Sequence, residues 1–157
     1  MMNWRYIIVL VAVVLIIVPL IRSLLKRRRD YEALSREVHG AKGCYLFLID
    51  KKFRVKETNF YELNENIHDD QPYVLGNVLH CQNGCESGLC GTGIACATCP
   101  IRMVIRNAFK LKRDFDHITA TMHLYDENYQ VREMDVKVAG RLVYVGYEPH
   151  FLVRVDS

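Results

Sequence analysis

The sequence predicts an α+β domain with an antiparallel sheet, carried behind one N-terminal transmembrane helix. Three observations predict it. Residues 6–21 form an uncharged apolar run, the segment after Pro100 has one apolar helical face, and the last forty residues alternate apolar and polar side chains as strands do. Half of the 157 residues are apolar and a quarter are charged, which excludes a disordered or collagen-like chain.

The apolar run is flanked in the way that membrane helices are. Sixteen residues are slightly fewer than the ~20 of a typical span, but Trp4 and Tyr6 can lie at one interface, and Arg5 and Arg22 can extend from the two ends. One Arg precedes the run and five basic residues follow it by position 29. A cleaved signal peptide would have the opposite order, and no small-x-small cleavage site is seen. Residues 1–25 are therefore predicted to be an uncleaved anchor.

The charge distribution also predicts orientation and partners. The first 29 residues hold six Lys and Arg and no acid, whereas residues 30–157 hold 15 basic and 18 acidic residues. Basic flanks stay cytoplasmic, so we expect the C-terminal domain to lie in the cytoplasm. An acidic domain is a poor nucleic-acid binder, and we expect no such partner.

The segments up to residue 80 are predicted to be short. Residues 26–40 carry Tyr31, Leu34 and Val38 at helical spacing, and we interpret them as a short amphipathic linker helix ended by Gly40. Residues 44–50 indicate a buried strand, and residues 53–58 its hairpin partner. Residues 60–68 and 74–80 indicate short helices, separated by a break at 69–72.

Residues 81–99 (CQNGCESGLCGTGIACATC), here called the cysteine loop, have no apolar period and are predicted to be a loop. Pro100 then begins a helix whose apolar positions recur at i, i+3, i+4, i+7 and i+8. Beyond it, alternation indicates three antiparallel strands, with a turn at 126–128 and a second turn or bulge at Gly140. Residues 41–157 are predicted to form one domain.

Three pieces of sequence in this order, GCYLFLID, FYELNENI and the closing FLVRVDS, resemble a PAS sensor domain. The cysteine loop resembles that of a cysteine-rich PAS subgroup of bacterial signalling proteins. The matching positions are Cys81, Cys90 with Gly91, Cys96 and Cys99, while Cys85 is additional. The resemblance implies a five-stranded antiparallel sheet with helices on one face, and a sensory function that is not enzymatic. Together with the anchor, it implies a bacterial inner-membrane protein. It also implies partners: a second copy, or a signalling protein such as a kinase or transcription regulator.

The spacing C-x8-C-x5-C-x2-C can place four thiolates around zinc or an iron–sulfur cluster. The C-x-x-C pair is the specific part, and the helix from Pro100 points its positive end at the loop, which favours thiolate. The predicted ligands are Cys81, Cys90, Cys96 and Cys99, with Cys85 as a possible addition. We slightly favour the cluster, because a sensor needs a centre that changes state and zinc has no redox chemistry.

Simpler interpretations stay open. The cysteines can be packing residues, although five within nineteen Gly-rich residues are hard to explain so. Cys96 and Cys99 before a helix are also the arrangement of a thiol–disulfide oxidoreductase or thiol switch, but that class needs a βαβ unit. A third alternative is a structural zinc module. His80 is a spare ligand candidate, Cys44 is expected in the core, and His68, His117, His123 and His150 are expected to be ordinary polar positions.

Overall fold

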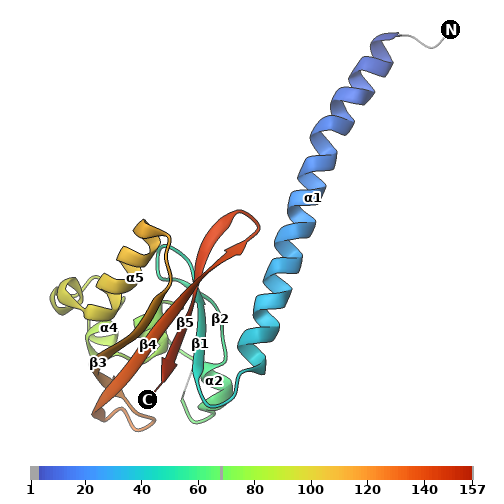
Figure 1. Cartoon of the computed structure of the whole chain (residues 1–157). Helices are drawn as coiled ribbons and strands as arrows, with labels where there is room; N and C mark the ends of the chain where they lie inside the picture. The colour runs from blue at the N-terminus through green and yellow to red at the C-terminus, as the bar shows by residue number, and fades with distance from the viewer. Residues whose placement is uncertain (1–3, 68, 157) are drawn as a thin grey trace.

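A computed structural model describes residues 4–67 and 69–156, and it shows an α+β domain beside one long helix (Figure 1). Three positions named in the sequence predictions lie outside the described residues: His68, Ser157 and the side chain of Arg5. The domain has a five-stranded antiparallel sheet, as predicted.

The long helix is α1 (Trp4–Gly40), and it is the one helix among the described residues that is long and apolar enough to cross a membrane. No residue of its apolar part is buried in the isolated chain. Pro19 lies inside the helix without ending it. The predicted linker at residues 26–40 is thus no separate helix: no Gly or Pro interrupts residues 20–39, and α1 continues from the apolar segment into the domain.

The strands are β1 (Tyr45–Ile49), β2 (Val55–Thr58), β3 (Phe115–Tyr125), β4 (Val131–Val145) and β5 (Glu148–Asp156), in the order β2-β1-β5-β4-β3. Every neighbouring pair is antiparallel. The first two strands and the last three therefore meet through β1 and β5, whose buried residues Phe47 and Phe151 contribute to the centre of the core.

Helices cover one face of this sheet. They are α2 (Phe60–Leu63), α3 (Leu75–Val78), α4 (Gln82–Glu86), the 3₁₀ helix η1 (Ile94–Thr98) and α5 (Pro100–Leu111). The periodicity after Pro100 predicted α5, which buries Ile101, Ile105 and Ala108 against the sheet. The cysteine loop differs from its prediction, because α4 and η1 give it two short helical turns.

The other face of the sheet is covered in part by α1. Leu34 and Val38 of α1 pack there against Leu46, Leu48 and Leu152, forming a second core. Burying such side chains stabilises the contact by about 2 kcal/mol each. The amphipathic spacing in residues 26–40 therefore marks the place where α1 rests on the sheet.

Of the turn or bulge expected at Gly140, the turn is absent, since β4 pairs with β5 without interruption from Lys137 to Val145. The irregularity lies opposite, in β3, between Phe115 and Ile118. Gly140 instead accommodates an aromatic ring: a Cβ added there would stand 2.2 Å from Cε1 of Phe115. Glycine is therefore needed at position 140 because of the contact with Phe115 across the strands, and not because the chain changes direction there.

Candidate functional site

The cysteine loop crosses the helical side of the domain between α3 and α5. Cys81 immediately precedes α4, Cys96 lies in η1, and Cys99 immediately precedes Pro100 at the start of α5. Cys90 lies in the stretch between α4 and η1. Four separate backbone segments thus supply the four predicted ligands.

Those four cysteines line one small cavity of about 50 Å³. Its other walls are mostly apolar, with Phe53, Leu79 and Met122 among them, and Arg102 on one side. Cys85, the additional candidate, lies on α4 and is not among the lining residues. The structure therefore separates the four cysteines of the predicted pattern from the fifth.

The four thiols share the cavity without forming a finished ligand shell. Across residues 4–67 and 69–156, no three His, Cys, Asp or Glu side chains are arranged to hold a metal ion. All six cysteines are free thiols. In type and number the donors fit a four-thiolate centre, and their side chains would have to turn toward a common point to bind one.

Cys90 is held in place by two glycines that allow close packing. A Cβ on Gly76 of α3 would stand 2.4 Å from the Cys90 sulfur, and one on Gly84 of α4 would stand 3.3 Å from its Cβ. Any side chain at position 76 would therefore displace the sulfur. Gly84 lies within the Gly-rich cysteine loop, whereas Gly76 lies before it.

Asn77 holds the cysteine loop by hydrogen bonds to its backbone, and this role was not predicted from the sequence. It is fully buried in α3, its Oδ1 accepts a 2.7 Å hydrogen bond from the Cys90 amide, and its Nδ2 donates to the carbonyls of Gly84 and Gly88. A buried amide needs such partners, because an unpaired one costs about 1–3 kcal/mol. A polar residue within the apolar run 74–79 was the available signal.

Arg102 is the cation of the site. Its Nη1 lies 3.3 Å from the carbonyl oxygen of Cys90 and 3.6 Å from its sulfur, and the guanidinium lies 4.2 Å from the ring centre of Phe53. Gly91, at φ +103°, passes so close to this group that a Cβ would stand 2.5 Å from Nη2. A positive charge therefore faces one of the four thiols and would offset part of the charge of a thiolate centre.

For three cysteines of the loop, Cys81, Cys85 and Cys90, burial favours the neutral thiol over the thiolate. Burial raises the pKa of Cys81, and the amides of Gly84 and Asn83 only partly oppose it. Burial also raises the pKa of Cys90 against the effect of Arg102, and it raises the pKa of Cys85 to about 11. In the metal-free chain these thiols are neutral at pH 7.

The remaining candidates lie outside the cavity. His80 is buried, with its ring stacked 6.5 Å from that of Phe60, and it does not line the cavity. Cys44 is half-buried against the core beneath α1, as expected. His150 is buried, although it was expected to be an ordinary polar position.

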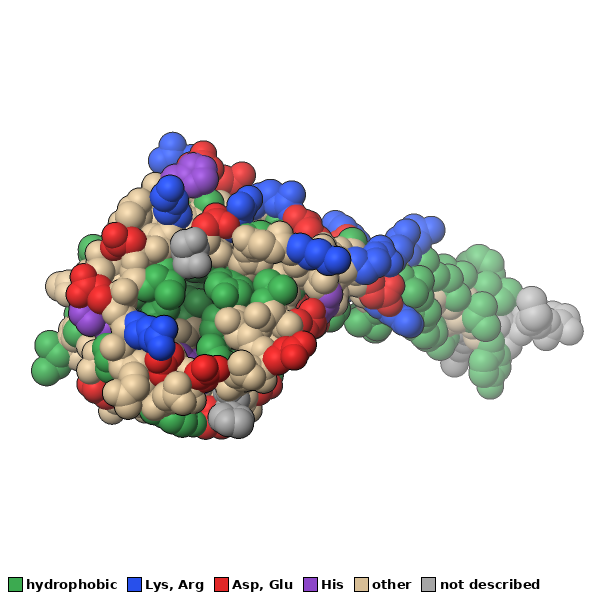
Figure 2. Space-filling model, turned by 90° about the horizontal axis from the view of Figure 1, so that it is seen from below, with side chains coloured by type: hydrophobic (Ala, Val, Ile, Leu, Met, Phe, Trp, Pro, Cys, Tyr) green, Lys and Arg blue, Asp and Glu red, His purple; other side chains and the backbone are tan. Residues whose placement is uncertain are grey.

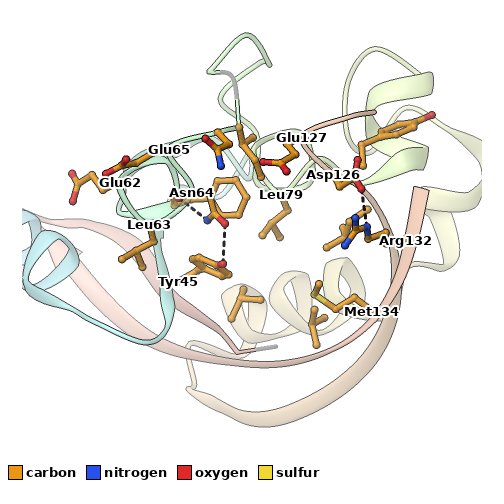
Figure 3. Close-up of a pocket in the computed structure, with 17 residues that line it drawn as sticks. Tyr45, Glu62, Leu63, Asn64, Glu65, Leu79, Asp126, Glu127, Arg132 and Met134 are labelled. Carbon is orange, nitrogen blue, oxygen red and sulfur yellow. Dashed lines mark hydrogen bonds and ion pairs between the residues drawn. The ribbon is translucent and has the colours of Figure 1, made fainter. Parts of the chain in front are cut away.

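A larger cavity of about 650 Å³ opens between α2, the chain after it and the β3–β4 hairpin (Figure 3). Its floor is apolar, with Leu79 and Met134, and Figure 2 shows apolar side chains in a hollow surrounded by polar and acidic ones. At the rim Arg132 pairs with Asp126 at 2.7 Å. This volume suits a small organic ligand.

No family model matches the chain, and no curated protein matches it either.

Proposed function

We propose that this protein is a membrane-tethered cytoplasmic sensory module of the PAS type, whose cysteine loop binds a metal centre. The observation that carries the proposal is the single small cavity lined by Cys81, Cys90, Cys96 and Cys99. The five-stranded antiparallel sheet and its helices support the PAS resemblance, and the apolar part of α1 supports the anchor. The basic residues that follow this part support an inner-membrane protein with a cytoplasmic domain.

An iron–sulfur cluster is slightly favoured over zinc as the occupant. When bound, a cluster supplies a centre that changes oxidation state or is lost to oxygen, which zinc does not. The protein's own contribution is to supply the four cysteines from separate segments, to surround them with apolar walls, and to place Arg102 beside Cys90.

A change at the metal centre would reach a partner protein through Cys99 and α5. This residue directly precedes α5, whose buried residues Ile101 and Ile105 pack on the sheet. A displacement of Cys99 would therefore shift α5 against the sheet and alter a protein contact made in trans. The partner is a second copy of the chain or a signalling protein such as a kinase or transcription regulator.

Two other functions remain as alternatives. A thiol–disulfide oxidoreductase or redox switch would use Cys96 and Cys99, but the entirely antiparallel sheet lacks the βαβ unit of that class. A structural zinc module would use the same four ligands and bind a partner without changing state.

The test is metal analysis of the full chain, purified in detergent without oxygen, with visible absorption and iron, zinc and acid-labile sulfide counted per chain. We expect broad absorption near ~400 nm, with iron and sulfide in near-equal amounts. The matched variants are Cys96→Ser, from the cavity wall, and Cys85→Ser, from outside it. The first should lose the metal and the second should keep it.

Other outcomes of the metal analysis would favour one of the alternative functions. About one zinc per chain without colour indicates the structural module. A chain that holds no metal and forms a reversible Cys96–Cys99 disulfide indicates the thiol switch or oxidoreductase. Equal metal loss in both variants would contradict the assignment of the cavity.

A further inference from the structure

A strongly basic groove of about 510 Å³ runs between the β1–β2 turn and α5, beside the cysteine cavity, with which it shares Phe53 and Arg102. Its cations come from both elements, and none of the described residues lining it is acidic. We call these cations the basic band: Lys51, Lys52, Arg102, Arg106 and Lys110. Arg102 is engaged with Phe53 and Cys90, whereas the other four side chains project into solvent.

The basic band continues toward α1. A second groove, of about 270 Å³, shares Lys51 and Lys52 with the first and ends at Glu148 of the β4–β5 hairpin. Two acids line this second groove, and both have basic partners: Asp50 lies 2.6 Å from Arg54, and Glu148 lies 3.6 Å from Arg27 of α1. The acids therefore do not reverse the positive charge of this surface.

The β4–β5 hairpin contacts α1 just after residue 25, where the predicted anchor ends. The Lys26 ammonium lies 4.6 Å from the ring centre of Tyr147, and the Gly146 amide donates to Asp30. Tyr147 is 73% exposed beside these contacts, as is typical of aromatic residues at a bilayer surface. The hairpin tip thus lies at the level where a membrane around α1 would end.

The basic band lies at this same end of the domain. In Figure 1 the β4–β5 hairpin, the β1–β2 turn and the C-terminal end of α5 all lie at the top of the domain. The apolar part of α1 extends beyond this same end. Lys112 and Arg113, both exposed, follow α5 there. Residues 30–157 as a whole are acidic, so this concentration of basic residues runs against the composition of the domain.

From this placement we propose that the basic band docks on anionic lipid headgroups and holds the domain against the membrane that anchors α1. An acidic domain tethered this closely would otherwise be repelled by an anionic leaflet, and each basic side chain near such a surface strengthens contact roughly fivefold. The proposal rests on the anchor of the proposed function and is independent of the metal centre.

Lysine acetylation in lipid nanodiscs tests the docking directly. The full chain is reconstituted in discs of phosphatidylcholine alone, or with about one third phosphatidylglycerol. Acetylation rates of individual lysines are then read by mass spectrometry. In the anionic discs Lys51 and Lys52 should be acetylated at no more than about one fifth of their rate in neutral discs, and about 0.5 M salt should remove the difference. Lys42 and Lys137, exposed elsewhere on the domain, are internal controls whose rates should change little.

Two charge-matched variants sharpen the result. Arg106→Glu with Lys110→Glu should abolish the protection of Lys51 and Lys52, whereas Lys42→Glu with Lys137→Glu should keep it. Equal rates in both kinds of disc, or equal behaviour of the two variants, would overturn the proposal. Protection by inorganic phosphate in neutral discs would assign the band to a soluble anion and overturn it too. Retention of the chain in washed discs tests the anchor separately, and metal analysis tests the centre.

Discussion

Replacing Gly76 by Ala tests whether the cavity geometry depends on close packing between α3 and Cys90. The added methyl would stand 2.4 Å from the Cys90 sulfur and 3.0 Å from its Cβ. Non-bonded heavy atoms settle near ~3.5–4.0 Å, so the Cys90 side chain must move by about 1 Å. All six cysteines remain in this variant, and only the position of one sulfur changes.

The cost follows from two opposing contributions to the free energy of unfolding. Overpacking a tight site costs about 1–3 kcal/mol, and Ala is favoured over Gly in a helix by up to about 1 kcal/mol. We therefore expect a net loss of about 1 kcal/mol, which lowers the Tm of a domain of this size by about 4 °C. The displaced Cys90 thiol should also be alkylated faster than in the parent chain.

The assay combines thermal unfolding of the detergent-solubilised full chain, followed by near-UV circular dichroism, with mass spectrometry of alkylated Cys90. Gly40→Ala is the matched control, because a Cβ at Gly40 meets nothing within 4 Å. If Gly76→Ala and Gly40→Ala show the same Tm and the same alkylation rate of Cys90, the packing argument fails. Loss of bound metal in Gly76→Ala alone would further support the proposed centre.

Two further predictions concern the stability of the folded domain. Burial raises the pKa of Asp50, but bonds from the backbone and guanidinium of Arg54 and from the Lys52 amide outweigh it and lower the pKa overall. Its stabilisation is therefore complete above the ordinary carboxyl pKa of ~4 and is lost as pH falls through the lower folded value. Asp50→Asn should cost about 1 kcal/mol at pH 7 and flatten the acid limb of a plot of stability against pH; parallel curves for the two chains would contradict this. Gly140→Ala should destabilise by about 2 kcal/mol through its clash with Phe115, and Phe115→Ala should relieve that clash, so additive losses in a double-mutant cycle would refute the contact.

The elements predicted correctly are those whose signals are local. Pro100 and the apolar period after it indicated α5 at the right position, and alternation indicated β3 and the start of β4. The Asp126 turn was also local, since its carboxylate accepts the amides of Asn128 and Gln130. These features depend on side chains only a few residues apart.

The features that sequence reasoning missed depend on contacts distant in the chain. Gly140 was expected to mark a turn or bulge, and a register shift does lie opposite it, but the contact with the ring of Phe115 on another strand was not foreseen. The spacing of Leu34 and Val38 indicated an apolar face but not the sheet that covers it. For the candidate site, the resemblance singled out the four cysteines that line the cavity, whereas the contacts of Gly76 and Asn77 with Cys90 became visible only in the folded chain.

The uninterrupted course of α1 has a mechanical consequence. One continuous helix runs from the apolar segment to its packing on the sheet, so no loop separates that segment from the domain. Inserting one residue within the apolar segment would lengthen the helix by about 1.5 Å and turn the domain by about 100° about the helix axis. If two anchors pair in the membrane, the facing surfaces of their domains are set by that phase, and a roll of either helix is transmitted to the sheet.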